Sequence, residues 1–139
     1  MNNANVYLSF NGTCEEAFEF YKSIFGGKFA AIARYSEMPE SDEYFIPAGE
    51  LSRLMHVSLV INESTVLMGS DVVSEHKDSL LEGNNFAISI NAESKEEADK
   101  LFAALSAGGV QKMIMQPTFW GSYFGMLTDK FGINWMINA

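Results

Sequence analysis

The stretch VYLSFNGTCEEAFEFYKSIFGG, residues 6–27, carries the signals for a strand, a turn and a helix in direct succession. Val6–Phe10 is β-branched and aromatic, and Asn11-Gly12 behind it is a turn signal. Thr13-Cys14-Glu15-Glu16 has the spacing of a capping box, which predicts that the helix begins at Thr13. Apolar residues then recur at steps of three and four until Gly26-Gly27, where we expect the helix to end.

The same order of signals returns in FAISINAESKEEADKLFAALSAGG, residues 86–109. Leu8-Ser9-Phe10-Asn11 matches Ile88-Ser89-Ile90-Asn91 at an offset of 80, and Glu15-Glu16-Ala17 matches Glu96-Glu97-Ala98 at 81. A second capping box, Ser94 to Glu97, predicts the second helix. The chain is therefore interpreted as a duplication.

Three strand-like runs follow each predicted helix, which makes each half β-α-β-β-β and the fold class α+β. The stretch Ser36–Arg53 has neither period and is expected to be a long surface loop. We expect one domain with a first module at about 4–73, a linker at 74–83 and a second module at about 84–139. The runs after the first predicted helix are Lys28–Tyr35, Leu54–Ile61 and Thr65–Asp71. Phe86–Ile90 precedes the second helix, and Gln111–Phe119, Ser122–Thr128 and Ile133–Asn138 follow it.

The charge of the chain excludes some classes of partner. Nine basic against eighteen acidic residues give a formal net charge of -9, which repels nucleic acid and anionic lipid. Cys14 is the one cysteine, so an internal disulfide is impossible and a reducing compartment is expected. With no signal peptide or membrane-spanning stretch in the sequence, we expect a cytoplasmic protein.

The alternation of strand side chains separates two kinds of sheet face. The apolar sets, which we expect to pack beneath the helices, are Val6, Leu8 and Phe10; Phe86, Ile88 and Ile90; and Ile133, Trp135 and Ile137. The opposite faces are small and polar, as is typical of a ligand cleft and equally of a solvated sheet face. Their members are Asn5, Tyr7 and Ser9; Asn85, Ala87 and Ser89; Asn134, Met136 and Asn138; and His56, Ser58, Met68 and Ser70.

These residues resemble the PhnB-like branch of the vicinal-oxygen-chelate (VOC) superfamily, which includes glyoxalase I, bleomycin-resistance proteins and extradiol dioxygenases. The resemblance covers nearly the whole chain. It is carried by Leu8–Gly12, Glu15–Tyr21, Phe25–Gly27, Met55-His56, Leu67–Asp71, Phe119–Gly121 and Asp129–Met136. It implies tandem βαβββ modules in a cup-shaped mixed sheet with the helices outside, and a homodimer.

The resemblance also indicates where a metal would bind. Enzymes of the superfamily hold a divalent ion with His, Gln or Glu from the first and fourth strand of each module. The matching positions here are Asn5, about Met68, Asn85 and Met136, which include no carboxylate and no imidazole. Thioethers are poor ligands for hard or borderline ions, so we expect no metal and no cofactor. A methyltransferase activity gains no support from the glycines, which lack the Gly-x-Gly-x-x-Gly pattern.

The leading hypothesis is a non-enzymatic or weakly enzymatic protein that binds a small organic molecule, for which the acidic charge allows a cation. The residues expected to line its site are His56, Ser58, Ser70, Trp120 and Tyr123. The aromatic pair belongs to a cluster with Phe119 and Phe124 for which a core or dimer-interface role is an equal alternative. Two other functions stay open: a metal-dependent glyoxalase- or dioxygenase-like enzyme that uses His56 with Glu50 or Glu63, and a structural or regulatory dimer with an occluded cleft.

Overall fold

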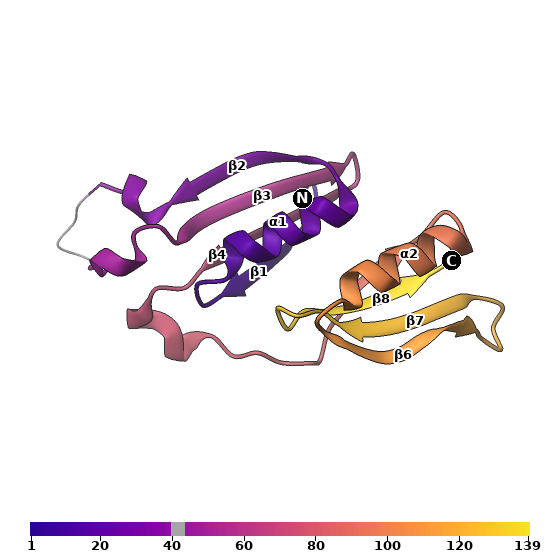
Figure 1. The fold of residues 1–139 in the computed structure, drawn as a ribbon. Coiled ribbons are helices and arrows are strands. Elements are labelled where there is room, and N and C mark those ends of the chain that lie inside the picture. Colours follow the sequence, from indigo (N-terminus) through magenta and orange to yellow (C-terminus); the bar gives the residue numbers. More distant parts are fainter. Residues whose placement is uncertain (40–43) are drawn as a thin grey trace. The chain divides into compact units, whose positions relative to one another are not determined.

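The fold is that of a computed structural model, which describes residues 1–39 and 44–139. The chain divides into two compact units, Met1–Leu81 and Glu82–Ala139, and each has its own sheet and its own helix (Figure 1). Among the described residues, no helix combines the length and the apolar character needed to cross a membrane.

The first unit is a four-stranded sheet of order β1-β4-β3-β2 with one helix on it. The β1–β4 pairing is parallel and the other two are antiparallel. Helix α1 packs against β3 and β4. The elements are β1 (Val6–Phe10), α1 (Cys14–Phe25), β2 (Lys28–Arg34), β3 (Leu54–Asn62) and β4 (Thr65–Asp71), with 3-10 turns η1 (Tyr35–Glu37), η2 (Ala48–Glu50) and η3 (Ser74–Ser79).

The second unit repeats this topology as β5-β8-β7-β6, again with one parallel pair, β5–β8. Helix α2 packs against β6, β7 and β8. The elements are β5 (Ile88–Asn91), α2 (Lys95–Ser106), β6 (Val110–Pro117), β7 (Tyr123–Thr128) and β8 (Asn134–Asn138). The predicted duplication of β-α-β-β-β and the α+β class are therefore confirmed.

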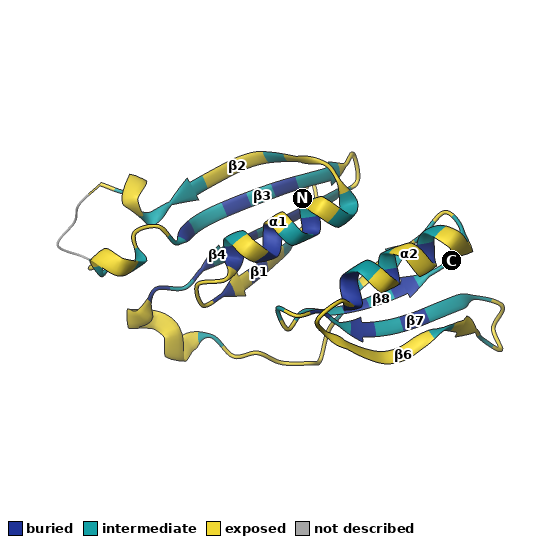
Figure 2. Cartoon of the chain, viewed as in Figure 1, coloured by how far each residue is buried: buried dark blue, intermediate teal, exposed yellow. Residues whose placement is uncertain are grey.

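The core of each unit lies between its helix and the facing side of its sheet. In the first unit Phe18 of α1 meets Phe10 edge to face, with 6.4 Å between ring centroids. Gly69 lets the helix approach, because a Cβ there would lie 2.7 Å from the Leu8 carbonyl oxygen and 2.8 Å from the Phe18 ring. Figure 2 shows the buried residues gathered on α1, β3 and β4. The fully covered side chains include Leu8, Ala17, Phe18, Tyr21, Leu54, Val57, Leu59 and Leu67.

The second core is built around Trp135 and Ile137 of β8 and Phe102 of α2, as the alternation predicts for β8. The prediction for β5, the parallel neighbour of β8, was wrong at one position. Phe86 lies two residues before β5 and is 57% exposed, whereas Ile88 and Ile90 are partly covered. β5 starts late because its pairing with β8 begins at Ile88, opposite Trp135.

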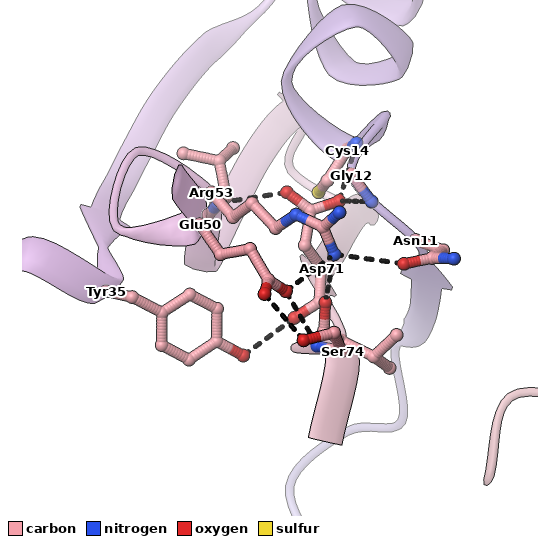
Figure 3. Close-up of polar contacts among 10 residues, drawn as sticks. Asn11, Gly12, Cys14, Tyr35, Glu50, Arg53, Asp71 and Ser74 are labelled. Atoms are coloured by element: carbon pink, nitrogen blue, oxygen red, sulfur yellow. Dashed lines mark hydrogen bonds and ion pairs between the residues drawn. The ribbon is translucent and has the colours of Figure 1, made fainter. Parts of the chain in front are cut away.

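The two helices begin by different means. Ser94 caps α2 as predicted, since its Oγ accepts a hydrogen bond from the Glu97 amide at 3.1 Å. Thr13 occupies the same position before α1, but its side chain makes no capping hydrogen bond, so the first capping box was a wrong prediction. Asp71 at the end of β4 takes that role instead: its Oδ1 accepts from the amides of Gly12 at 2.8 Å and Cys14 at 2.9 Å (Figure 3).

The stretch predicted as a long loop, Ser36–Arg53, includes residues 40–43, which lie outside the described part. Its described part contains η1 and η2, and arginine side chains near both of its ends bind other parts of the first unit. At one end Arg34 forms a bidentate ion pair with Glu15 of α1, at 2.9 and 2.6 Å. At the other end Arg53 donates to the Asn11 side chain and to the Val72 carbonyl oxygen (Figure 3).

Candidate functional site

The side of the first sheet opposite α1 carries most of the polar residues predicted for a site. Leu8, Val57, Leu59 and Leu67 are buried toward the helix, so the residues that alternate with them point the other way. We call this side the helix-free face. Strand register puts its residues in two rows: Tyr7, Met68, Ser58 and Ala31, then Ser9, Ser70, His56 and Ala33.

Tyr7 and His56 form a contact across this face. Their ring centroids are 5.9 Å apart with the planes inclined by 30°, and the Tyr7 Oη lies 3.5 Å from His56 Nδ1. Such a distance is at the long limit of a hydrogen bond, so the contact is weak. Tyr7 comes from β1 and His56 from β3, and β4 lies between them. The Tyr7–His56 contact therefore spans β4, the strand that carries Met68 and Ser70.

The serine hydroxyls on this face are available to a ligand. Ser58 and Ser70 are partly covered, and within the described ranges neither hydroxyl hydrogen-bonds another side chain or the backbone. Ser58 stands beside Met68 in the register and Ser70 beside Ser9. A hydroxyl can donate one hydrogen bond and accept two. The face thus presents an imidazole, a phenol and free hydroxyls from three adjacent strands.

Tyr35 lies at the end of this group, just after β2. Its hydroxyl donates to the Asp71 backbone oxygen at 2.7 Å. Burial raises the pKa of the Tyr35 phenol, and the charge of Asp71 and the Tyr7 hydroxyl raise it further. The phenol is therefore neutral, and with its proton donated to the backbone it offers a ligand only acceptor capacity.

A polar cluster fixes the ends of the strands that carry these residues (Figure 3). The Asp71 Oδ2 accepts from the Leu54 amide at 3.0 Å, which joins the start of β3 to the end of β4. Glu50 accepts from the backbone amide and the hydroxyl of Ser74, both at 2.6 Å, and pairs with Arg53 at 3.3 Å. The hydroxyl of Ser74 lowers the pKa of Glu50, so its carboxylate is charged and engaged by Ser74 and Arg53.

The residues considered as metal ligands do not form a site suited to the ions of the superfamily. Glu50 is engaged by Ser74 and Arg53, and Glu63 lies in the β3–β4 turn, about 20 Å along the strand from His56. Across residues 1–39 and 44–139, no three His, Cys, Asp or Glu side chains come together as a ligand set. The positions that match the superfamily ligands are Asn5 and Met68 in one unit and Asn85 and Met136 in the other; two of the four carry thioethers, which suit hard or borderline ions poorly, and none carries a carboxylate or an imidazole.

The two predicted site residues of the second unit lie on different sides of its sheet. Tyr123 points to the helix side, where its hydroxyl donates to Asp99 of α2 at 2.6 Å and thereby has its pKa raised. Trp120 is 58% exposed and packs against Phe124, with centroids 6.0 Å apart. Phe124 belongs to the opposite side, in line with Met126 on the same strand. Trp120 is thus accessible, whereas Tyr123 is engaged by the helix.

Sequence reasoning placed Tyr7 on the correct face but did not choose it as a site residue, and it missed Tyr35. Alternation from Leu8 was a sufficient signal for Tyr7, since it puts that ring beside Met68. Nothing local marks Tyr35, because its partner Asp71 is 36 residues away.

Comparison with known proteins gives a consistent result along the whole chain. The sequence model of the family described as 3-demethylubiquinone-9 3-methyltransferase matches residues 2–138. Protein YjdN of Escherichia coli (strain K12) is 33% identical, with 96% of this chain and 92% of YjdN covered. The crystal structure of protein PA1353 from Pseudomonas aeruginosa is 38% identical with a TM-score of 0.82, covering 99% of this chain and 97% of that one.

Two further structures extend the comparison. A putative 3-demethylubiquinone-9 3-methyltransferase, PhnB protein, from Bacillus cereus is 25% identical with a TM-score of 0.78, and 98% of each chain is covered. A glyoxalase/bleomycin resistance protein/dioxygenase family enzyme from Burkholderia phytofirmans PsJN shares the fold, with 19% identity, a TM-score of 0.63, and 97% of this chain and 98% of that one covered.

Proposed function

Because this chain belongs to the PhnB-like family of the VOC superfamily, we propose that it binds a small organic molecule on the helix-free face of its first sheet. Tyr7, His56, Ser58 and Ser70 are the residues that would contact the ligand. Catalysis is not part of the proposal, which concerns binding alone.

The observation that supports this proposal is the combination of the weak Tyr7–His56 contact with unpaired hydroxyls beside it. Small-molecule sites are mostly apolar surfaces with a few converging polar groups. Met68, Ala31 and Ala33 supply the apolar part of this face. The sheet backbone beneath is held by the Asp71 cluster, so the polar groups are presented from a rigid base.

We propose that binding needs no metal ion. The proposal rests on the chemistry of the donor set: two of the four matching positions carry thioethers, none carries a carboxylate or an imidazole, and Glu50 is occupied by Ser74 and Arg53. Elemental analysis of protein purified without chelator tests this point. Stoichiometric nickel, zinc, iron or manganese would overturn it and would favour a glyoxalase- or dioxygenase-like enzyme.

The binding proposal is tested by a ligand screen with matched variants. A metabolite library is screened by thermal shift against the native chain, the double variant Ser58→Ala/Ser70→Ala, and His56→Gln. The control is His76→Gln, which alters the other histidine, an exposed residue of η3. We expect ligands whose stabilising effect is lost in the first two variants and kept in the control. Ligands that stabilise all four proteins equally would refute the site.

Two attributes accompany the proposal. We propose a homodimer, as is typical of PhnB-like proteins, and sedimentation equilibrium at the mass of one 15.4 kDa chain would contradict it. The family description also names a methyl transfer, which S-adenosylmethionine titrated by calorimetry tests directly.

Trp120 is retained as a candidate stacking residue of the second unit, and Trp120→Ala belongs in the same screen.

A further inference from the structure

The acidic residues of this chain are almost absent from its strands. Of the eight strands that the structure describes, the single acidic residue is Asp71, the last residue of β4. The other described carboxylates lie on helices, 3-10 turns, connections and hairpin turns, such as Glu15 and Glu19 on α1 or Glu63 after β3. Within residues 1–39 and 44–139, the strands therefore contribute only one carboxylate, that of Asp71.

Asp71 does not bring its charge to the helix-free face. Its position alternates with that of Ser70, which puts its side chain on the helix side, and both carboxylate oxygens accept hydrogen bonds from the backbone amides of Gly12, Cys14 and Leu54. It is 2% exposed. A carboxylate satisfied in this way cannot act as the counter-ion of a ligand on the opposite side.

Two side chains on the helix-free face carry basic nitrogen atoms. His56 is on the helix-free face, and Lys28 at the start of β2 pairs with Val60, which shares that face with Ser58. Beside His56 stand hydroxyls that can donate. If the Tyr7 hydroxyl donates to His56 Nδ1, the Nε2 of the ring carries the hydrogen and donates outward.

We propose that the ligand of the helix-free face carries an oxyanion, such as a carboxylate, and not the cation that the acidic net charge suggests. The inference rests on the proposed function above. Hydrogen bonds to an ionised acceptor are about twice as strong as neutral ones. Surface charges more than about 8 Å away are largely screened at physiological salt. The imidazole and hydroxyls act on a ligand at contact distance, whereas no acidic residue of the described strands shares this face, so we expect these donors to set the ligand's charge.

The test uses three probes of one shape and different charge: benzoate, benzamide and benzylamine. Each is titrated into full-length protein labelled at the methionine methyl groups and the imidazole rings, and chemical shifts are followed by NMR. Met68 and His56 report the face, while Met115, whose sulfur lies against Gly125 in the second unit, and His76 report elsewhere. We expect benzoate to shift the Met68 and His56 signals at concentrations where benzylamine does not.

Two variants make the test specific to charge. Ser58→Asp puts a carboxylate on the face and should weaken benzoate binding by about tenfold while admitting benzylamine. Ser23→Asp adds the same charge on the exposed surface of α1 and should leave both affinities unchanged. Folding of each variant is checked by its amide spectrum.

The outcomes separate this inference from the proposal beneath it. Benzylamine or benzamide bound at Met68 and His56 with benzoate excluded would overturn the oxyanion and leave the site standing. Shifts confined to the reporters of the second unit, or none with any probe, would overturn both. Equal loss of benzoate affinity in Ser58→Asp and Ser23→Asp would also refute it, because the effect would then come from net charge and not from this face.

Discussion

Asp71→Asn is the substitution that most directly tests how the strands of the proposed site are held. The carboxylate accepts three backbone hydrogen bonds, two on Oδ1 from Gly12 and Cys14 and one on Oδ2 from Leu54. An asparagine has a single acceptor oxygen, so its amide nitrogen must face at least one of these N–H donors. At a side chain only 2% exposed, water cannot replace the lost acceptor.

The expected cost is about 2–4 kcal/mol, from one lost charge-assisted hydrogen bond and one buried donor left unsatisfied. That is a large part of the roughly 5–15 kcal/mol by which a domain is stable. The assay is urea unfolding of the first unit followed by its amide resonances, because both tryptophans, Trp120 and Trp135, lie in the second unit. Amide exchange at Cys14 and Leu54 should accelerate together.

The matched control is Asp78→Asn, which removes the same charge from exposed η3. It should change stability by less than about 0.5 kcal/mol. Asp71→Asn could instead change stability as little as Asp78→Asn, or leave amide exchange at Cys14 and Leu54 unaffected. Either result would show that the carboxylate does not hold together the start of α1, the start of β3 and the end of β4.

Three other predictions concern local contacts. Ser94→Ala should lower the stability of the second unit by about 1 kcal/mol in urea unfolding, whereas Thr13→Ala, which removes no cap, should have a much smaller effect on the first. Burial raises the pKa of the Cys14 thiol, so a disulfide reagent should modify it at pH 8 only on unfolding; rapid reaction of the native chain would contradict this. The hydrogen bond from Arg34 lowers the pKa of Glu15, so the pair stabilises above the carboxyl's unfolded pKa and this contribution is lost as pH falls through the folded one. Arg34→Met should therefore cost under about 1 kcal/mol at pH 7, since both side chains are well exposed, and a difference that persists at pH 2 would refute the pairing.

The sequence predicted the architecture well because its signals are local. Alternation and helical spacing act over a few residues, and the repeat of the Leu8–Asn11 pattern at Ile88–Asn91 gave two independent readings of one topology. The mixed sheet came with the family resemblance; the structure shows that its parallel pair in each unit joins the first and fourth strands, which the sequence analysis did not specify.

The wrong predictions are those decided by distant partners. Thr13 had the local pattern of a cap, but the helix start is held by Asp71, 57 residues from Cys14, whose charged oxygen accepts from the Gly12 and Cys14 amides. Phe86 fits the alternating pattern of β5, but it lies before Ile88, the first residue of that strand that pairs with β8. A pattern along one strand cannot show where its neighbour ends.

The candidate site was predictable as a face but not as a set of contacts. Parity placed His56, Ser58 and Ser70 together, and the register confirms that they share one side of the sheet. Alternation along β7 puts Tyr123 on the side of the sheet opposite to Phe124. The hydrogen-bond partner of Tyr123, Asp99, lies on α2, so this contact could not be predicted from the strand sequence.

The most direct test of the central claim is a crystal structure of the native chain soaked with a chemically diverse fragment library. The account predicts that bound fragments recur within hydrogen-bonding distance of His56, Ser58 and Ser70, and that the Tyr7–His56 contact opens when they bind. Fragments that gather repeatedly elsewhere while this face stays bare would contradict it.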